Sequence, residues 1–166
     1  MRLISVTSQR RGFMNNPHFT MPKVRILVAD ASKARLFRVD SPTGELIEVS
    51  SDVNPEARLH DNDLTTDKPG RAADSMNSGR SAMEDPTDPK EVESQKFARQ
   101  LNDKLEKARN RREIEKLYIA APPRFLGELR KHFKPELKSL IVEEIGKDFS
   151  QLEAKHLRKH LPERLK

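Results

Sequence analysis

The chain has 166 residues, of which 34% are hydrophobic and 35% are charged, and it contains no cysteine. This length favours a single domain with a modest core, and the absence of cysteine excludes disulfides, thiolate metal sites and a cysteine nucleophile. The net charge of +6 favours partners that carry negative charge, such as RNA, DNA or anionic membrane surfaces.

The N-terminal segment shows no sustained pattern. Its first twenty residues carry three arginines and no acid, and their apolar stretch is too short for a secretory signal. We expect residues 1–21 to form a disordered extension, with an Arg-rich targeting peptide as the alternative. The folded domain is expected over 22–162, followed by a basic tail over 163–166. No stretch approaches the roughly 20 apolar residues that cross a bilayer, so the expected location is the cytoplasm, without membrane contact.

Three strands are predicted at the start of the domain. Residues 24–30 (VRILVAD) form a nearly continuous apolar run, which is typical of a central strand buried on both faces. Residues 34–40 alternate between polar and apolar, which predicts a half-buried strand, and residues 46–50 follow after the turn SPTG. The short connections predict that these three strands are antiparallel neighbours.

A long polar segment comes next. We expect residues 54–88 to form a mobile loop, because connections of this length inside a domain are usually functional or disordered. A helix is predicted over 89–110, since Asp88 can cap it, Pro89 suits its first position and Glu91 completes a capping box.

Two strands and two helices complete the predicted order. The strands are expected over 116–121 and 139–145, with a helix over 124–133 between them. Ser150, followed by Glu153 as a second capping box, predicts a last helix. The order βββ, loop, αβαβα predicts a three-layer α/β fold of the ribonuclease-H-like type, with a mixed five-stranded sheet and flanking helices.

That fold class suggests a metal-dependent nuclease, which needs carboxylates that converge at neighbouring strand ends. Asp30 ends the first strand, and Glu91 or Glu93 lies on the first helix, but the fourth strand ends in AAPP without an acid. We therefore interpret Asp30 as an acceptor of backbone amides in the turn that follows its strand.

Three histidines are weaker candidates. His156 and His160 are four residues apart and could share a metal, but no third ligand is evident, so a solvated basic face is the simpler interpretation. His60 stands beside two aspartates and could act as an acid or base near neutral pH.

The basic residues after Ser150 could contact phosphates or form a solvated end. No metal and no cofactor are expected.

Several segments together resemble a known family. They are VADASKARLFRV, NPEARLHDNDLTTDKPGRAADS, SGRSAMEDPTDPKEVESQKFARQL, LYIAAPPRFLGELRKHF and IVEEIGKDF, and they look like the bacterial host attachment proteins, which are described as required for attachment to host cells. The likeness covers about residues 22–150. That family is in turn considered similar to the middle domain of archaeal and eukaryotic peptide-chain release factors, which implies the fold predicted above and a tRNA or ribosome partner.

Release factors carry a Gly-Gly-Gln loop before a long helix, and here the corresponding place reads Ser78, Gly79, Arg80. This chain therefore lacks the catalytic glutamine that the resemblance implies, although the guanidinium of Arg80 could bind a phosphate. The candidate RNA-binding residues all lie in this loop: His60, Lys68, Gly70, Arg71, Ser78, Gly79 and Arg80.

The favoured function is a cytoplasmic, translation-associated domain that binds RNA or ribosomes through the loop before the first helix. The alternative is a non-enzymatic protein-interaction factor that acts indirectly in attachment to host cells, with the metal-dependent nuclease as a third hypothesis. Catalysis is not the favoured reading; if it occurs, the substrate is expected to be peptidyl-tRNA or RNA.

Overall fold

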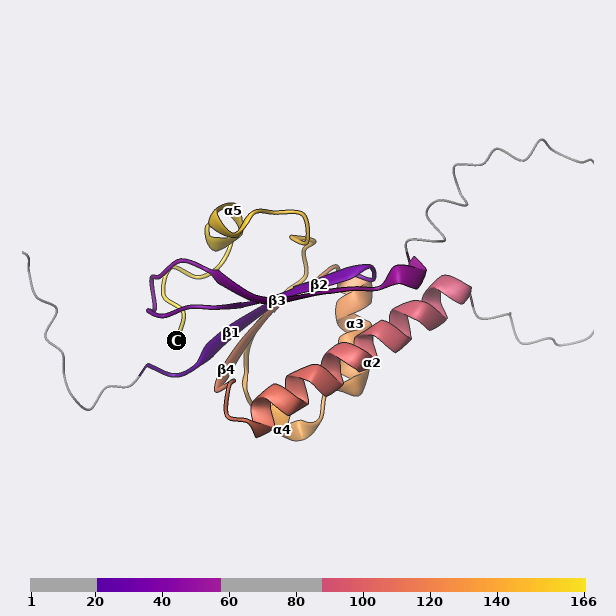
Figure 1. Cartoon of the computed structure of the whole chain (residues 1–166), viewed down its shortest axis with the longest axis horizontal. Helices are drawn as coiled ribbons and strands as arrows, with labels where there is room; N and C mark the ends of the chain where they lie inside the picture. The colour runs from indigo at the N-terminus through magenta and orange to yellow at the C-terminus, as the bar shows by residue number, and fades with distance from the viewer. Residues whose placement is uncertain (1–20, 58–87) are drawn as a thin grey trace, which may run out of the picture.

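A mixed five-stranded sheet forms the centre of the computed structural model, which describes residues 21–57 and 88–166 (Figure 1). Its strands are β1 (Val24–Ala29), β2 (Lys33–Arg38), β3 (Ile47–Val53), β4 (Lys116–Ala120) and β5 (Ile141–Ile145). Their order across the sheet is β3-β2-β1-β4-β5. Strand β2 is antiparallel to β1 and β3, whereas β4 is parallel to β1 and β5. Four strands therefore end on the same side, which we call the carboxyl end of the sheet; the opposite side is the amino end.

Helices cover both faces of the sheet, which gives three layers (Figure 1). They are α2 (Pro89–Asn110), α3 (Pro123–His132), α4 (Pro135–Lys138) and α5 (Ala154–Arg158). The first three pack on one face and share a core with it, and α5 and the C-terminal residues pack on the other. The predicted mixed sheet with flanking helices is confirmed, while the likeness to ribonuclease-H-like and release-factor folds stays a prediction.

Strand β1 is buried on both faces, as its apolar run predicts. Leu27 and Ala29 belong to the core under α2 and α3, whereas Ile26 and Val28 belong to the core under α5. Alternate side chains of a strand point to opposite faces, so a strand between two helical layers needs apolar residues at consecutive positions. The continuous run is thus a consequence of its central place.

Helix α2 has the bounds that its caps and periodicity predict. Asp88 Oδ1 accepts a hydrogen bond from the backbone amide of Lys90 at 3.1 Å, which satisfies one of the free donors at the helix start. Glu91, expected to complete a capping box, lies instead with its Oε2 3.6 Å from Arg124 Nη2 on α3. The first turn of α2 is therefore tied to the start of α3.

The prediction of a helix that begins at Ser150 is wrong. Helix α5 has five residues, Ala154–Arg158, and no side chain caps it. Ser150 is 1% exposed and follows a turn in which Asp148 Oδ1 accepts from its backbone amide at 2.9 Å. This turn places Phe149 in the core under α5, so burial of that ring takes precedence over an early helix start.

Two smaller differences concern α4 and β3. The short helix α4 was not predicted, and β3 ends at Val53 rather than at residue 50. The longer β3 keeps its pairing with β2 as far as the register Lys33↔Val53. Beyond residue 50, Asp52 also forms an ion pair with Lys104 on α2, with Oδ2 and Nζ 2.5 Å apart.

The last residues pack against the second face of the sheet. Within the expected basic tail, Leu165 is fully buried, and its backbone amide donates to Pro42 O at 2.9 Å. The backbone amide of Lys166 donates to Tyr118 Oη at 3.1 Å. The guanidinium of Arg158 donates to carbonyl oxygens on both sides of this contact, including Gly44 O at 3.0 Å. These bonds join the C-terminal residues to the turn between β2 and β3.

Candidate functional site

A pocket of about 370 Å³ lies at the carboxyl end of the sheet, where β1 and β4 end and where α2 and α3 begin. Ligands of open α/β sheets commonly bind outside the carboxyl ends of the strands. The charged residues that line it are Asp30, Asp88, Lys90, Glu91, Arg124, Glu128 and Asp148. Acids outnumber bases in this lining, so the pocket is a poor match for phosphate groups.

Asp30 accepts hydrogen bonds within its own turn, as predicted. Its Oδ1 accepts from Ser32 N and Ser32 Oγ, both at 2.6 Å, and from Lys33 N at 2.8 Å. Burial acts to raise the pKa of Asp30, but the hydroxyls of Ser150 and Ser32 and these two amides outweigh it and lower the pKa. Ser150 Oγ is buried without a hydrogen bond of normal geometry, so we assign the stabilisation of the charged form mainly to Ser32 and Lys33.

The lowered pKa of Asp30 predicts a pH-dependent contribution to stability. A carboxylate with a folded-state pKa below its unfolded value, about 3.9, stabilises the fold above that value and loses the contribution as the pH falls through the folded pKa. We expect Asp30→Asn to be less stable than the wild type at neutral pH, and the difference to shrink below about pH 4. Urea unfolding at neutral and acidic pH measures this, and a pH-independent difference would contradict it.

The carboxylates named for a metal site are engaged elsewhere. Glu91 lies near Arg124, and Glu93 Oε1 lies 2.6 Å from Lys96 Nζ. Across residues 21–57 and 88–166, no group of three Asp, Glu or His residues is placed to hold a metal ion. His160 stacks on Phe149 with ring centroids 4.8 Å apart, and His156 is exposed. The nuclease hypothesis thus gains no support from these residues.

All the residues predicted to bind RNA lie outside the described part of the chain: His60, Lys68, Gly70, Arg71, Ser78, Gly79 and Arg80. The described residues on either side of that segment belong to the carboxyl end, since Asp88 lines the pocket there and Asn54 donates to Ala31 O at 3.1 Å. In sequence, residues 58–87 carry four basic and six acidic side chains. The positive excess of the chain therefore lies elsewhere.

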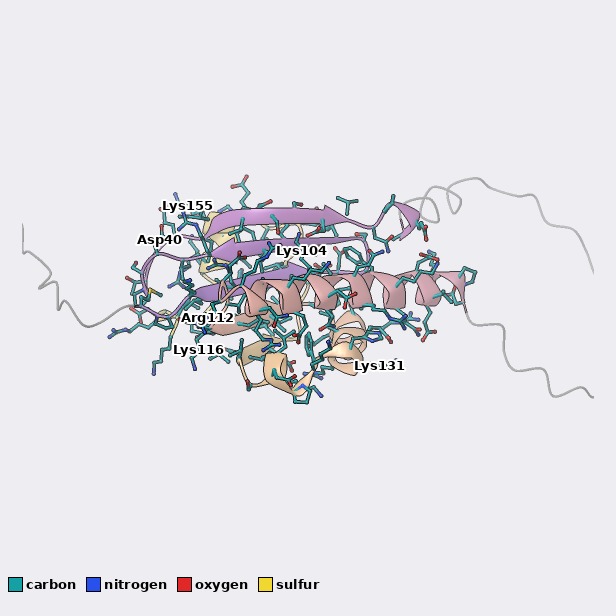
Figure 2. The ribbon with its side chains drawn as sticks, turned by 60° about the horizontal axis from the view of Figure 1, so that its bottom comes forward. Asp40, Lys104, Arg112, Lys116, Lys131 and Lys155 are labelled. Atoms are coloured by element: carbon teal, nitrogen blue, oxygen red, sulfur yellow. The ribbon has the colours of Figure 1, made fainter. Side chains whose placement is uncertain are left out.

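Basic side chains gather at the amino end of the sheet. Arg25 and Arg38 are directly opposite each other in the β1–β2 ladder. Lys23 Nζ donates to Arg112 O at 2.8 Å, which brings the residue before β1 against the turn that precedes β4. Figure 2 shows Arg112 and Lys116 at this same end. We call the following set the amino-end basic surface: Lys23, Arg25, Arg38, Arg111, Arg112 and Lys116.

This surface keeps unpaired positive charge. Burial lowers the pKa of Arg25 and the facing Arg38 lowers it further, although the nearby acids Glu113 and Asp40 raise it. Arg38 pairs with Asp40. The side chains of Arg111, Arg112 and Lys116 form no ion pair with any residue that the structure describes. They are therefore available to an anionic partner.

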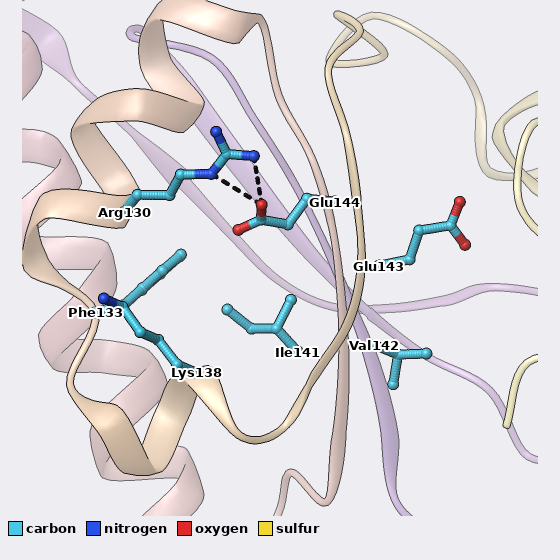
Figure 3. Close-up of a pocket in the computed structure, with 7 residues that line it drawn as sticks. All are labelled: Arg130, Phe133, Lys138, Ile141, Val142, Glu143 and Glu144. Carbon is cyan, nitrogen blue, oxygen red and sulfur yellow. Dashed lines mark hydrogen bonds and ion pairs between the residues drawn. The ribbon is translucent and has the colours of Figure 1, made fainter.

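A third feature is a groove of about 470 Å³ along the edge strand β5 (Figure 3). Phe133 and Ile141 line it, and Arg130 Nε donates to Glu144 Oε2 at 2.8 Å across it. Val142 lies on the outer side of this strand and is 45% exposed. The groove is therefore mixed, with apolar side chains beside a formed ion pair.

Comparison with known families identifies the family of this chain. A family model described as "Protein required for attachment to host cells" covers residues 25–161. The chain belongs to this family. The match runs from β1 to beyond α5, so both ends of the sheet lie within the host attachment domain. No curated protein matches the chain.

Family membership confirms the resemblance to host attachment proteins, while the further similarity to release-factor middle domains stays a prediction. In the described ranges of this host attachment domain, no helix is both long and apolar enough to cross a bilayer. The amino-end basic surface escaped sequence analysis because its residues are scattered along the chain. Its available signal was the short β1–β2 connection, which sets Arg25 opposite Arg38.

Proposed function

We propose that this chain is a cytoplasmic RNA-binding factor of the translation apparatus, and that its role in attachment to host cells is indirect. The observation that carries the proposal is the amino-end basic surface, with Arg111, Arg112 and Lys116 free of ion pairs within the described residues. Most of the affinity of proteins for nucleic acid comes from phosphate contacts by arginine and lysine. An RNA partner satisfies this surface better than a neutral small molecule.

The translation part of the proposal comes from the resemblance to release-factor middle domains. The strand order β3-β2-β1-β4-β5, with only β2 reversed among these five, is compatible with the order of elements predicted from the sequence. Because residues 58–87 carry more acidic than basic side chains, we place the principal RNA contact at the amino end of the sheet and not in the loop. Lys68, Arg71 and Arg80 remain candidates for a second contact, and the absent glutamine keeps peptide release out of the proposal.

Binding to tRNA is expected to depend steeply on salt. If about four phosphates of a single-stranded or looped region are contacted, the slope of log K against log salt is near −3, which is roughly a 50-fold loss between about 50 and 200 mM salt. Fluorescence anisotropy with labelled tRNA over a salt series measures it. No binding at the lowest salt would contradict RNA binding.

A second candidate is the protein-interaction factor. It is favoured by the exposure of apolar side chains on both edge strands, with Val49 49% and Val53 48% exposed on β3 and Val142 45% exposed on β5. Edge strands with apolar side chains can accept a strand from a partner protein. Acidic side chains lie among the apolar ones on both strands, Glu48 and Asp52 on β3 and Glu143 and Glu144 on β5, so either edge could carry such a contact.

A further inference from the structure

Arg112 holds a backbone conformation that normally belongs to glycine. Its φ angle is 56°, and it is the one non-glycine residue with positive φ in the described ranges. It follows the end of α2, where the amide of Arg112 donates to Arg109 O at 2.8 Å and the amide of Glu113 donates to Ala108 O at 2.9 Å. Such bonds close a helix end in the left-handed conformation, for which glycine is the usual residue.

An arginine at this position strains the backbone, because its Cβ crowds the neighbouring carbonyl in the left-handed region. Strained residues persist where the surrounding structure fixes them, and they cluster at functional sites. Here the bond from Lys23 Nζ to Arg112 O, at 2.8 Å, helps to fix the turn. The fold therefore tolerates a backbone strain that glycine would avoid. Because the arginine supplies a guanidinium that glycine lacks, we look for the role of this residue in its side chain.

The surroundings of Arg112 indicate what the guanidinium contacts. A hollow of about 350 Å³ beside it is lined by Arg109, Arg112, Ile114, Glu115, Glu136, Ser139 and Leu140. A neighbouring hollow of about 290 Å³ is lined by Met21, Pro22, Lys23, Arg25, Arg38, Val39 and Asp40. Lys23 joins the two, since it lines the second hollow and is bonded to Arg112.

Two of the acids at this end are engaged by neighbouring groups. Glu115 Oε2 accepts from the backbone amide of Lys23 at 2.9 Å, and Asp40 pairs with Arg38. Arg109 is neutralised in turn by Glu106, with Nη2 and Oε2 2.9 Å apart. Glu115 and Glu136 line the first hollow, and the exposed Glu113 directly follows Arg112, so an anion would have to avoid these carboxylates. Of the two arginines that line the first hollow, Arg112 alone forms no ion pair within the described residues.

We propose that Arg112 is the central phosphate-binding residue of the amino-end basic surface and that it grips the RNA backbone together with Lys23. This inference rests on the proposed RNA-binding function and adds the residue that dominates it. A guanidinium binds phosphate through two parallel N–H bonds, which suits a discrete phosphate next to a hollow. The proposed RNA-binding function makes RNA the favoured source of phosphate, and lipid headgroups are the alternative that the test below distinguishes.

The test compares Arg112→Gly, Arg112→Lys and a matched control, Arg99→Ala. Arg99 is an exposed arginine of the same helix, 13 positions before Arg112 and so roughly 20 Å away along the axis. The probes are labelled tRNA and, separately, phosphatidylserine vesicles, and thermal unfolding is followed in parallel.

Arg112→Gly is expected to bind tRNA about fivefold more weakly, while its melting temperature stays equal or rises by a few degrees because strain is relieved. Arg112→Lys keeps the charge but not the forked geometry, so it is expected to fall between Arg112→Gly and the wild type. Arg99→Ala is expected to bind within about twofold of the wild type.

The failures are distinguishable. A wild-type chain that binds no tRNA overturns the proposed function and this inference with it. A wild type that binds tRNA as tightly as Arg112→Gly does overturns this inference alone. A lower melting temperature in Arg112→Gly overturns the strain argument, and tighter binding to the vesicles than to tRNA overturns RNA as the occupant.

Discussion

Replacing Leu165 by alanine is expected to lower the free energy of unfolding by about 2–4 kcal/mol. The side chain is fully buried in the core under α5, to which Leu157 and Leu161 also belong. Truncation removes apolar contacts and leaves a cavity that a packed core fills only in part. Urea unfolding followed by circular dichroism measures the change.

The control for this prediction is the neighbouring Arg164→Ala. Arg164 is exposed, so its replacement is expected to change the free energy of unfolding by less than about 0.5 kcal/mol. If Leu165→Ala unfolds like the wild type, the C-terminal residues do not belong to the packed core.

Charge reversal on the amino-end basic surface is expected to weaken tRNA binding on the order of a hundredfold at about 50 mM salt. The double variant is Arg111→Glu with Lys116→Glu, which replaces two positive charges by two negative ones. Both side chains are exposed and form no ion pair within the described residues, so the fold is expected to survive. Anisotropy with labelled tRNA measures the affinity, and thermal unfolding checks the fold.

A charge-matched control separates this surface from net charge. Arg99→Glu with Lys147→Glu changes the net charge by the same amount at exposed positions away from the amino end. We expect this control to lose less than about tenfold in affinity, through long-range attraction alone. Equal losses in both double variants would show that RNA contacts no particular surface.

Local sequence signals predicted the elements that depend on local physics. The bounds of α2 follow from the cap at Asp88 and the apolar spacing of Phe97, Leu101 and Leu105, all of which are buried. The turn role of Asp30 depends on residues two and three positions away, and it too is confirmed.

Tertiary contacts decided the features that local signals could not predict. Helix α5 starts late because the residues before it place Phe149 in the core under α5. Leu165 is buried because the chain returns to Pro42, which is far away in sequence. The amino-end basic surface likewise depends on strand pairing and on the contact of Lys23 with Arg112. Apart from the pairing of Arg25 with Arg38, which the short β1–β2 connection indicates, none of these contacts has a signature within a short window of sequence.

Sedimentation of the wild-type chain with ribosomes, in low and high salt and before and after nuclease digestion, tests the central claim most directly. We expect the chain to pellet with ribosomes at about 50 mM salt, and to stay in the supernatant once salt screens the phosphates or RNA is digested. A chain that remains in the supernatant at low salt, or that keeps a protein partner unchanged after digestion, would contradict RNA binding, and the second outcome would favour the protein-interaction factor.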